Sequence, residues 1–329
     1  MAIWFKTLRR CPQAESIKGI KQMKKVLITG GAGFIGANLV RRLLVEGYSI
    51  RVLDNFATGQ RSYLAGLDIE LVEGDILDRD GVQTAVRDVN GVIHLAAQTS
   101  VPDSVAEPFY DCRLNVLGTL NLLEACRQAE VPRFLFASSN APLGRQRPPA
   151  HEAQAPLPIS PYGASKLAGE GYCMAYHGSW GLGTIILRFA NLYGPFSRHT
   201  QGVVAQFYKA MLAKRPLTIH GDGQQTRDFI FVGDLCRAIQ LALESEISGE
   251  LFQIATGTET SILALTEQIA QVTQQPIEVA HSERRAGDIG QDYAAVSKAA
   301  KLLGWQPTTP LADGLMQTWE WFRSKKEKT

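Results

Sequence analysis

Residues 24–36 of this chain read Lys24-Lys25-Val26-Leu27-Ile28-Thr29-Gly30-Gly31-Ala32-Gly33-Phe34-Ile35-Gly36. The apolar run 26–28 is short and rich in β-branched residues, which predicts a buried strand. The glycines that follow fit two spacings, Gly31-x-Gly33-x-x-Gly36 and Gly30-x-x-Gly33-x-x-Gly36, and residues 37–46 carry an apolar stripe at helical spacing. Glycines between a strand and a helix are typical of a dinucleotide-binding turn, where the backbone approaches a pyrophosphate and the helix N-terminus offers free N–H groups.

An acidic residue follows where such a turn requires one. Residues 49–53 predict a second strand, and Asp54 closes it. A carboxylate at this place can accept hydrogen bonds from both hydroxyls of the adenosine ribose, and it repels a 2′-phosphate. The sequence therefore predicts NAD rather than NADP as the cofactor.

Strands and helices alternate from Asp54 onward, which predicts a parallel sheet. We expect further strands at 68–73, 91–97, 133–137 and 184–189, and helices at 79–89, 108–130 and 165–177. The alternation loosens beyond residue 194, where a smaller lobe should lie over the cofactor crevice. The predicted fold is a Rossmann-like, doubly wound α/β sheet with a smaller mixed α/β lobe. Residues 23–190 should form mainly the first part and 191–329 mainly the second, with some interleaving.

Composition is that of an ordinary globular protein, with 329 residues, 45% apolar, 20% charged and a net charge of +2. Nothing here predicts nucleic acid or an acidic membrane surface as a partner. The five cysteines are scattered and form no Cys-x-x-Cys pair, and the histidines show no metal-ligand spacing. We expect reduced thiols, a cytoplasmic protein, no metal and no membrane span.

Residues 1–22 precede the first predicted strand and carry several basic side chains. Their longest apolar run is too short for a signal peptide. A disordered extension is the main interpretation, and a helix that binds a partner or a membrane surface is the alternative.

A candidate catalytic pair lies at Tyr162 and Lys166, four residues apart and so on one face of a helix. A free tyrosine has a pKa of about 10, and a nearby ammonium lowers it toward the range useful for a base. Such a base can take a proton from an alcohol while a hydride leaves carbon. Ser139, which follows the fifth predicted strand, can orient that alcohol.

These features occur together with further motifs in the same order along residues 24–322. The motifs are Thr29-Gly30-Gly31-Ala32-Gly33-Phe34-Ile35-Gly36, Asp54-Asn55, Gly74-Asp75-Ile76, His94-Leu95-Ala96-Ala97, Asn115-Val116-Leu117-Gly118-Thr119, Ser138-Ser139, Tyr162-Gly163-Ala164-Ser165-Lys166, Arg188-Phe189-Ala190-Asn191-Leu192-Tyr193-Gly194-Pro195, Gly221-Asp222-Gly223-Gln224-Gln225-Thr226-Arg227-Asp228-Phe229, Arg285-Ala286-Gly287-Asp288 and Ser297-Lys298-Ala299. The chain resembles the extended short-chain dehydrogenase/reductase family, specifically its NAD-dependent nucleotide-sugar epimerases and dehydratases.

The resemblance implies roles for individual residues. Cofactor contacts would come from Gly30, Gly33, Phe34, Ile35, Gly36, Asp54, Asn55, Asp75, Ile76, Leu95, Ala96, Ala97, Tyr162 and Lys166. Asp75 and Ile76 would contact adenine, and Asn115 would position Lys166 through water. Asn191, Arg227 and Arg285 would hold the diphosphate of a UDP-sugar, which also suits the charge of the two arginines. Asp288 would contact the nucleotide, or instead cap a helix or join an ion pair. The sugar pocket should include Ser100, Val101, Asn140, Ala141 and Asp292.

One departure from the family pattern bears on the reaction. Similar 4,6-dehydratases carry Asp-Glu directly after the catalytic hydroxyl, whereas this chain has Asn140 and Ala141. Neither side chain is an acid or a base, so the sequence favours C4 epimerisation over elimination. Asp292 would repel a uronate, which favours UDP-glucose or UDP-galactose. UDP-glucuronate epimerisation, decarboxylation, dehydration and reduction remain alternatives, as does a binding protein that senses NAD.

The resemblance also implies a homodimer that pairs helices at 108–129 and 162–178. The first of these carries more apolar residues than one sheet-facing stripe needs, namely Leu114, Leu117, Leu120, Leu122 and Leu123. The alternative is that the second lobe simply covers this helix.

Overall fold

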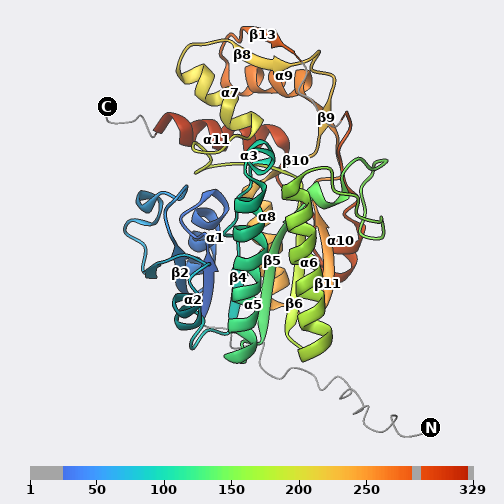
Figure 1. Cartoon of the computed structure of the whole chain (residues 1–329). Coiled ribbons are helices and arrows are strands. Elements are labelled where there is room, and N and C mark those ends of the chain that lie inside the picture. Colours follow the sequence, from blue (N-terminus) through green and yellow to red (C-terminus); the bar gives the residue numbers. More distant parts are fainter. Residues whose placement is uncertain (1–24, 284–289, 325–329) are drawn as a thin grey trace, which may run out of the picture.

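A seven-stranded parallel sheet forms the centre of the molecule (Figure 1). The structure is a computed structural model that describes residues 25–283 and 290–324. Across the sheet the strands are β11 (Glu250–Ile254), β6 (Gly183–Phe189), β5 (Arg133–Ser139), β4 (Gly91–His94), β1 (Lys25–Thr29), β2 (Ser49–Asp54) and β3 (Glu70–Glu73). All neighbouring pairs run parallel. The predicted doubly wound α/β fold is therefore confirmed.

Strand order places a ligand crevice at one edge of this sheet. The chain proceeds from β1 outward through β2 and β3, then returns to β4 on the other side of β1. In open α/β sheets, ligands bind beyond the carboxyl ends of the strands at such a reversal. Thr29 of β1 pairs with His94 of β4, so the glycine turn begins at this point.

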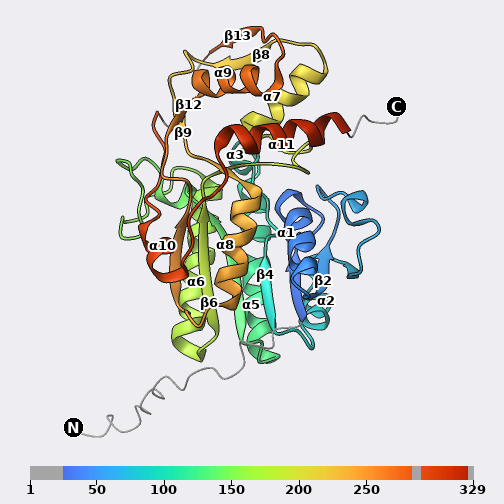
Figure 2. The same cartoon turned by 180° about the vertical axis from the view of Figure 1, so that it is seen from behind.

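Helices cover both faces of the sheet. One face carries α2 (Arg79–Ala85), α5 (Gly118–Gln128) and α6 (Pro161–Trp180), seen in front in Figure 1. The other carries α1 (Phe34–Val45) and α8 (Val232–Glu244), with α10 (Ser297–Leu303) over edge strand β11, as Figure 2 shows from behind. Val26 and Ile28 join the core on the second face and Leu27 the core on the first. Because both faces are buried, the central strand β1 carries consecutive apolar residues, Val26 to Ile28, rather than an alternating pattern.

The smaller lobe lies beyond the carboxyl ends of the strands (Figure 1). Its strands pair as β7 (Asn191–Tyr193) with β10 (Phe229–Phe231), β8 (Leu217–His220) with β13 (Val279–Ser282), and β9 (Thr226–Arg227) with β12 (Thr260–Ser261). Its helices are α7 (Val203–Leu212), α9 (Ile262–Thr273) and α11 (Leu311–Ser324). Between these elements the chain returns to the large sheet to add α8, β11 and α10.

Some element boundaries differ from prediction. Helix α6 begins at Pro161 rather than residue 165, because the Ser160 side chain accepts a hydrogen bond from the Gly163 amide and Pro161 suits the first helical turn. The helix expected over 108–130 consists of α4 (Pro108–Cys112), the π-helical η3 (Arg113–Leu117) and α5. Helix α2 ends four residues earlier than expected, at Ala85 rather than residue 89. A short helix, α3 (Val101–Ala106), was not predicted.

Residues 1–22, for which an extension was predicted, lie outside the described residues. Among the helices of 25–283 and 290–324, none combines the length and the apolar character needed to cross a membrane.

Candidate active site

The glycine turn between β1 and α1 is packed too closely for side chains. Gly30 has a φ of +69°, and a Cβ there would lie 2.7 Å from the Ala96 nitrogen. A Cβ on Gly36 would lie 2.5 Å from the Gly30 carbonyl oxygen. Gly33, the N-cap of α1, brings no side chain to the helix N-terminus. The first amides of α1, from Phe34 onward, are thus available to an anion such as a pyrophosphate.

Asp54 ends β2 beside this turn and is 7% exposed. Its Oδ2 accepts a hydrogen bond from the Ala32 amide and its Oδ1 one from the Phe56 amide, both at 2.8 Å. Each oxygen keeps a further lone pair for a ribose hydroxyl. The side-chain amide of the next residue, Asn55, donates to Asp75 Oδ2 over 3.0 Å. The acid therefore joins the turn to β2 at the place predicted for an adenosine ribose.

Ile76, predicted to contact adenine, has its side chain in the core. It is 4% exposed and packs against Gly118, where an added Cβ would lie 2.5 Å from Ile76 Cδ1. A contact with adenine would have to come from its backbone. Leu95, Ala96 and Ala97 follow β4 beside the glycine turn, and the Ala96 amide donates to Thr29 Oγ1 over 3.3 Å.

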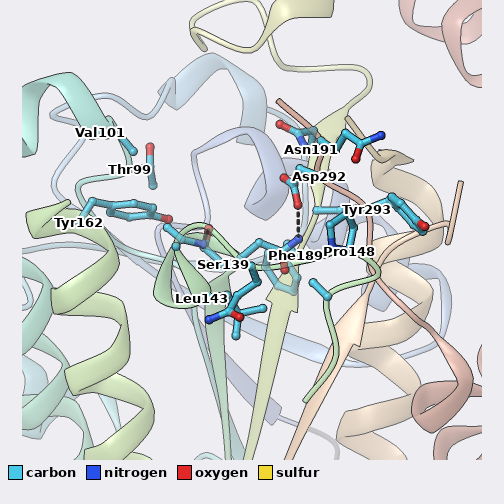
Figure 3. A pocket seen from close by; sticks show the side chains of 17 residues that line it. Thr99, Val101, Ser139, Leu143, Pro148, Tyr162, Phe189, Asn191, Asp292 and Tyr293 are labelled. Atoms are coloured by element: carbon cyan, nitrogen blue, oxygen red, sulfur yellow. Dashed lines mark hydrogen bonds between the residues drawn. The ribbon is translucent and has the colours of Figure 1, made fainter. Parts of the chain in front are cut away.

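The predicted catalytic set meets where β5 and α6 adjoin. Ser139 is the last residue of β5, and Tyr162 and Lys166 occupy successive turns of α6. The Tyr162 phenol and the Ser139 side chain face each other beside a cavity, as Figure 3 shows. Lys166 Nζ donates to the Ala137 carbonyl over 2.9 Å and lies 4.9 Å from the centroid of the Phe136 ring.

Burial determines the proton affinities of this set. It raises the pKa of Tyr162 to about 12, although the neighbouring Ser139 hydroxyl lowers that pKa. Burial lowers the pKa of Lys166 to about 8, although the negative charges of Asp111 and Glu170 act to raise that pKa. The prediction that Lys166 lowers the pKa of Tyr162 is therefore wrong for this geometry. The ammonium binds the Ala137 carbonyl, and desolvation of the phenol dominates.

Asn115 acts on the neighbour of Lys166 rather than on Lys166 itself. It lies in the π-helical turn η3, a distortion frequent at functional sites. Its Nδ2 donates to Ser165 Oγ over 3.1 Å and to Asp111 Oδ1 over 3.0 Å. The backbone amide of Gln98 donates to Asn115 Oδ1 over 2.9 Å. A contact through water, as the resemblance implies, would be additional to these bonds.

A cavity of about 340 Å³ opens beside Ser139 and Tyr162. It is large enough for a sugar residue. Its lining residues are Thr99, Val101, Ser139, Asn140, Ala141, Leu143, Gly144, Gln146, Pro148, Ala150, Tyr162, Phe189, Ala190, Asn191, Gln291, Asp292 and Tyr293 (Figure 3).

Asp292 is the acid in this cavity. Burial raises its pKa, while Arg227 and hydrogen bonds from Asn140 and Asn191 lower it. The bond from Asn140 Nδ2 to Asp292 Oδ1 is 3.4 Å long (Figure 3). Arg227 ends β9 and donates to the Thr226 carbonyl over 2.7 Å. The structure thus brings together four of the predicted substrate-binding residues, namely Asn140, Asn191, Arg227 and Asp292.

Ser100, predicted for the pocket wall, is not among the residues that line the cavity. Its hydroxyl accepts a hydrogen bond from the Asp103 amide and caps α3, and Thr99 lines the cavity instead. Arg285 and Asp288 lie outside the described residues. The prediction also missed the loop before α6, where the Ala150 amide donates to the Tyr293 carbonyl over 2.8 Å. No sequence motif marks this loop. Phe189 and Ala190, which also line the cavity, belong to the quoted motif 188–195.

A doubly wound sheet, a glycine turn on a helix N-terminus and an acid at the end of β2 define a dinucleotide-binding enzyme fold. Residues 26–255 match the NAD dependent epimerase/dehydratase family. The chain belongs to this family, as the resemblance implied, and its cofactor is NAD. The close glycine turn and the buried Asp54 fit the pyrophosphate and the unphosphorylated ribose of that cofactor.

Comparisons with individual proteins agree. The chain is 38% identical over 313 residues to the UDP-glucose 4-epimerase of Mycolicibacterium smegmatis, which covers 92% of this chain and all of that protein. The UDP-glucose 4-epimerase of Thermotoga maritima, solved with UDP-glucose, is 36% identical with a TM-score of 0.88, over 92% and 99% of the two chains. The UDP-glucuronic acid 4-epimerase of Bacillus cereus, solved with UDP-glucuronic acid and NAD, is 32% identical with a TM-score of 0.86, over 92% and 100%.

Proposed function

We propose that this protein interconverts the C4 epimers of a UDP-hexose of the glucose and galactose type. The observation that carries this proposal is the pairing of Ser139 and Tyr162 beside a cavity whose wall at Asn140 and Ala141 offers no acid or base. Epimerisation needs a proton acceptor at the C4 hydroxyl and nothing at C5. Elimination of water needs further proton transfers, for which these two side chains are unsuited.

Each residue of the set has a role in this reaction. Ser139 orients the C4 hydroxyl, and Tyr162 removes its proton and later returns it. NAD held by the glycine turn and Asp54 would supply a hydride acceptor and donor at C4, and the positive charge of its oxidised ring would favour the phenolate. Lys166 holds strand β5 through the Ala137 carbonyl, two residues before Ser139. The cavity gives the sugar room to turn over, so that hydride can return to its other face.

The choice of sugar rests on Asp292. Its carboxylate lies in the cavity wall, where it opposes the C6 carboxylate of a uronate and accepts hydrogen bonds from a neutral hexose. UDP-glucuronate is the second candidate, because burial raises the pKa of Asp292 and its protonated form repels nothing. The relative from Bacillus cereus acts on that substrate. A sensor without catalysis is disfavoured, since it needs no Tyr162.

The test is product analysis with the purified full-length protein. We expect incubation with UDP-glucose to give UDP-galactose, with the bound cofactor oxidised at the end. Conversion of UDP-glucuronate but not UDP-glucose would contradict the proposed substrate and still support the proposed epimerisation. A UDP-pentose or a 4-keto-6-deoxy product would contradict the proposed reaction.

We also propose that the protein is a homodimer, that it is cytoplasmic and that its two parts divide mainly at residue 190.

A further inference from the structure

A buried ionic cluster lies directly behind the catalytic set. Glu170 of α6 is 4% exposed, and its Oε1 accepts hydrogen bonds from Ser138 Oγ at 2.5 Å and Arg188 Nε at 2.7 Å. Its Oε2 accepts one from Arg188 Nη2 at 2.6 Å. Ser138 of β5 pairs in register with Arg188 of β6, which pairs with Gln253 of β11. One carboxylate therefore joins α6 to two neighbouring strands.

The cluster is aligned with the residues that carry the reaction. Tyr162, Lys166 and Glu170 are spaced four residues apart, so they share the inner face of α6. Lys166 holds the Ala137 carbonyl and Glu170 holds the Ser138 hydroxyl, and the next residue of β5 is Ser139. Between them, Gly169 lets α6 approach the sheet, since a Cβ there would lie 2.5 Å from Phe136 Cζ.

We propose that Glu170 is a positioning residue of the active site, which fixes Ser139 and Lys166 relative to each other through Ser138 and Arg188. It touches neither substrate nor cofactor. Its two effects are mechanical and electrostatic. It clamps the residue before Ser139, and it places a negative charge one helical turn from the Lys166 ammonium. The inference rests on the proposed function for the roles of Ser139 and Lys166.

Among the residues that the structure describes, few titratable groups face Lys166. They are Glu170 and Cys173 on α6, Asp111 on α4 and His94 on β4. Burial lowers the pKa of His94 to about 3, and it raises the pKa of Cys173, so both are neutral near pH 7. Loss of the Glu170 charge would leave Asp111 as the anion facing Lys166 and Arg188 as a buried cation nearby.

The test compares Glu170→Gln with Asp234→Asn, a matched control. Asp234 is also buried, at 3% exposed, and accepts hydrogen bonds from the Thr308 and Thr309 amides, but it lies on α8 across the sheet. Two quantities are measured on the folded full-length proteins. One is kcat and KM for UDP-glucose, and the other is the titration of Lys166 by NMR in ¹³C-lysine protein, assigned with Lys166→Met.

We expect Glu170→Gln to lower kcat about tenfold or more with KM changed less than about threefold, because a misplaced group costs rate rather than binding. The Lys166 titration should fall by about one pH unit. Asp234→Asn should lower the melting temperature and leave both quantities at wild-type values. Wild-type kcat and titration in Glu170→Gln, or equal losses in the control, would overturn the proposal.

Glu170→Gln leaves Arg188 buried without its counter-charge, which can prevent folding. The double variant E170Q/R188M removes both charges and should fold, with kcat still reduced. Recovery of wild-type kcat in the double variant would overturn the proposal. The titration needs no substrate. If the wild-type protein converts no UDP-sugar, the proposed function fails, while a shifted Lys166 titration in Glu170→Gln would still support the clamp and an unshifted one would overturn it.

Discussion

The ammonium of Lys166 donates a hydrogen bond to the backbone carbonyl of Ala137, 2.9 Å away, and this bond joins helix α6 to strand β5 two residues before Ser139. Lys166 is 4% exposed, and burial lowers its pKa to about 8. A charged group is thus held where desolvation opposes its charge. Such an arrangement costs stability and is typical of catalytic sites.

We therefore expect Lys166→Met to abolish epimerisation and to stabilise the fold by about 2 kcal/mol at pH 7. The folded pKa of about 8 lies below the unfolded value of 10.5, so between these values the unfolded chain binds the proton and the folded chain does not. Wild-type stability should rise with pH through this window relative to the variant. Urea unfolding at pH 7 and pH 9.5 measures this, and a difference independent of pH would contradict the buried charge.

Tyr162→Phe should keep the fold and the bound NAD and lose at least about 10²-fold in kcat, the usual contribution of a positioned acid–base group. Tyr162 is buried beside Ser139, and phenylalanine keeps its ring, so the change takes away the hydroxyl without opening a large cavity. Circular dichroism and the absorbance of bound NAD serve as controls. Near-normal turnover would remove Tyr162 from the mechanism.

Asp54→Ala should weaken NAD binding and reduce discrimination against NADP. The Asp54 carboxylate also accepts hydrogen bonds from the Ala32 and Phe56 amides, so the alanine variant loosens the glycine turn as well. Asp54→Asn keeps an oxygen acceptor for one of these two amides while it removes the charge. Titration of both variants with NAD and NADP separates the two effects. Equal affinity of the wild-type protein for NAD and NADP would contradict the assigned role of the acid.

Local patterns predicted the parts of the fold that depend on neighbouring residues. Val26 to Ile28 form a buried strand because both sheet faces are covered, and the glycines are required by backbone contacts within the same turn. The start of α6 was placed too late because the cap at Ser160 lies in a proline-rich loop that the apolar pattern does not mark.

Contacts between distant segments could not be predicted in the same way. Thr99 rather than Ser100 lines the cavity because Ser100 is used to cap α3, and a cap is visible only once that helix is known. The pKa of Tyr162 was predicted in the wrong direction because the spacing to Lys166 says nothing about burial. The contacts of Glu170 with Ser138 and Arg188 could not be predicted either, because they join α6 to β5 and β6.

The homodimer stays a prediction, and exposed apolar side chains on α4 and α6 support it. Phe109 is 90% exposed and Trp180 56%. We expect light scattering at micromolar concentration to give twice the chain mass, and Phe109→Asp to give a monomer. Val45→Asp is the matched control, since Val45 is 87% exposed on α1. A wild-type monomer at this concentration would contradict the predicted homodimer.

Asp292→Asn tests which sugar the cavity accepts. The Asp292 side chain lies in the cavity wall and accepts a hydrogen bond from Asn140, so its charge faces the space where the sugar's C6 group can lie. An amide at this position removes the repulsion of a uronate. We expect kcat/KM for UDP-glucuronate, relative to UDP-glucose, to rise about tenfold, a change that corresponds to about 1.4 kcal/mol.

The pH dependence supplies a second reading of the same variant. Because burial raises the pKa of Asp292, its neutral form persists to higher pH than in a free carboxyl. Wild-type turnover of UDP-glucuronate relative to UDP-glucose should therefore rise as the pH falls, and Asp292→Asn should abolish that dependence. Glu267→Gln, an equal charge change on the exposed face of α9, should leave both ratios unaltered. A wild-type preference for UDP-glucuronate at pH 8 would show that Asp292 does not exclude uronates, and the substrate would then have to be reassigned.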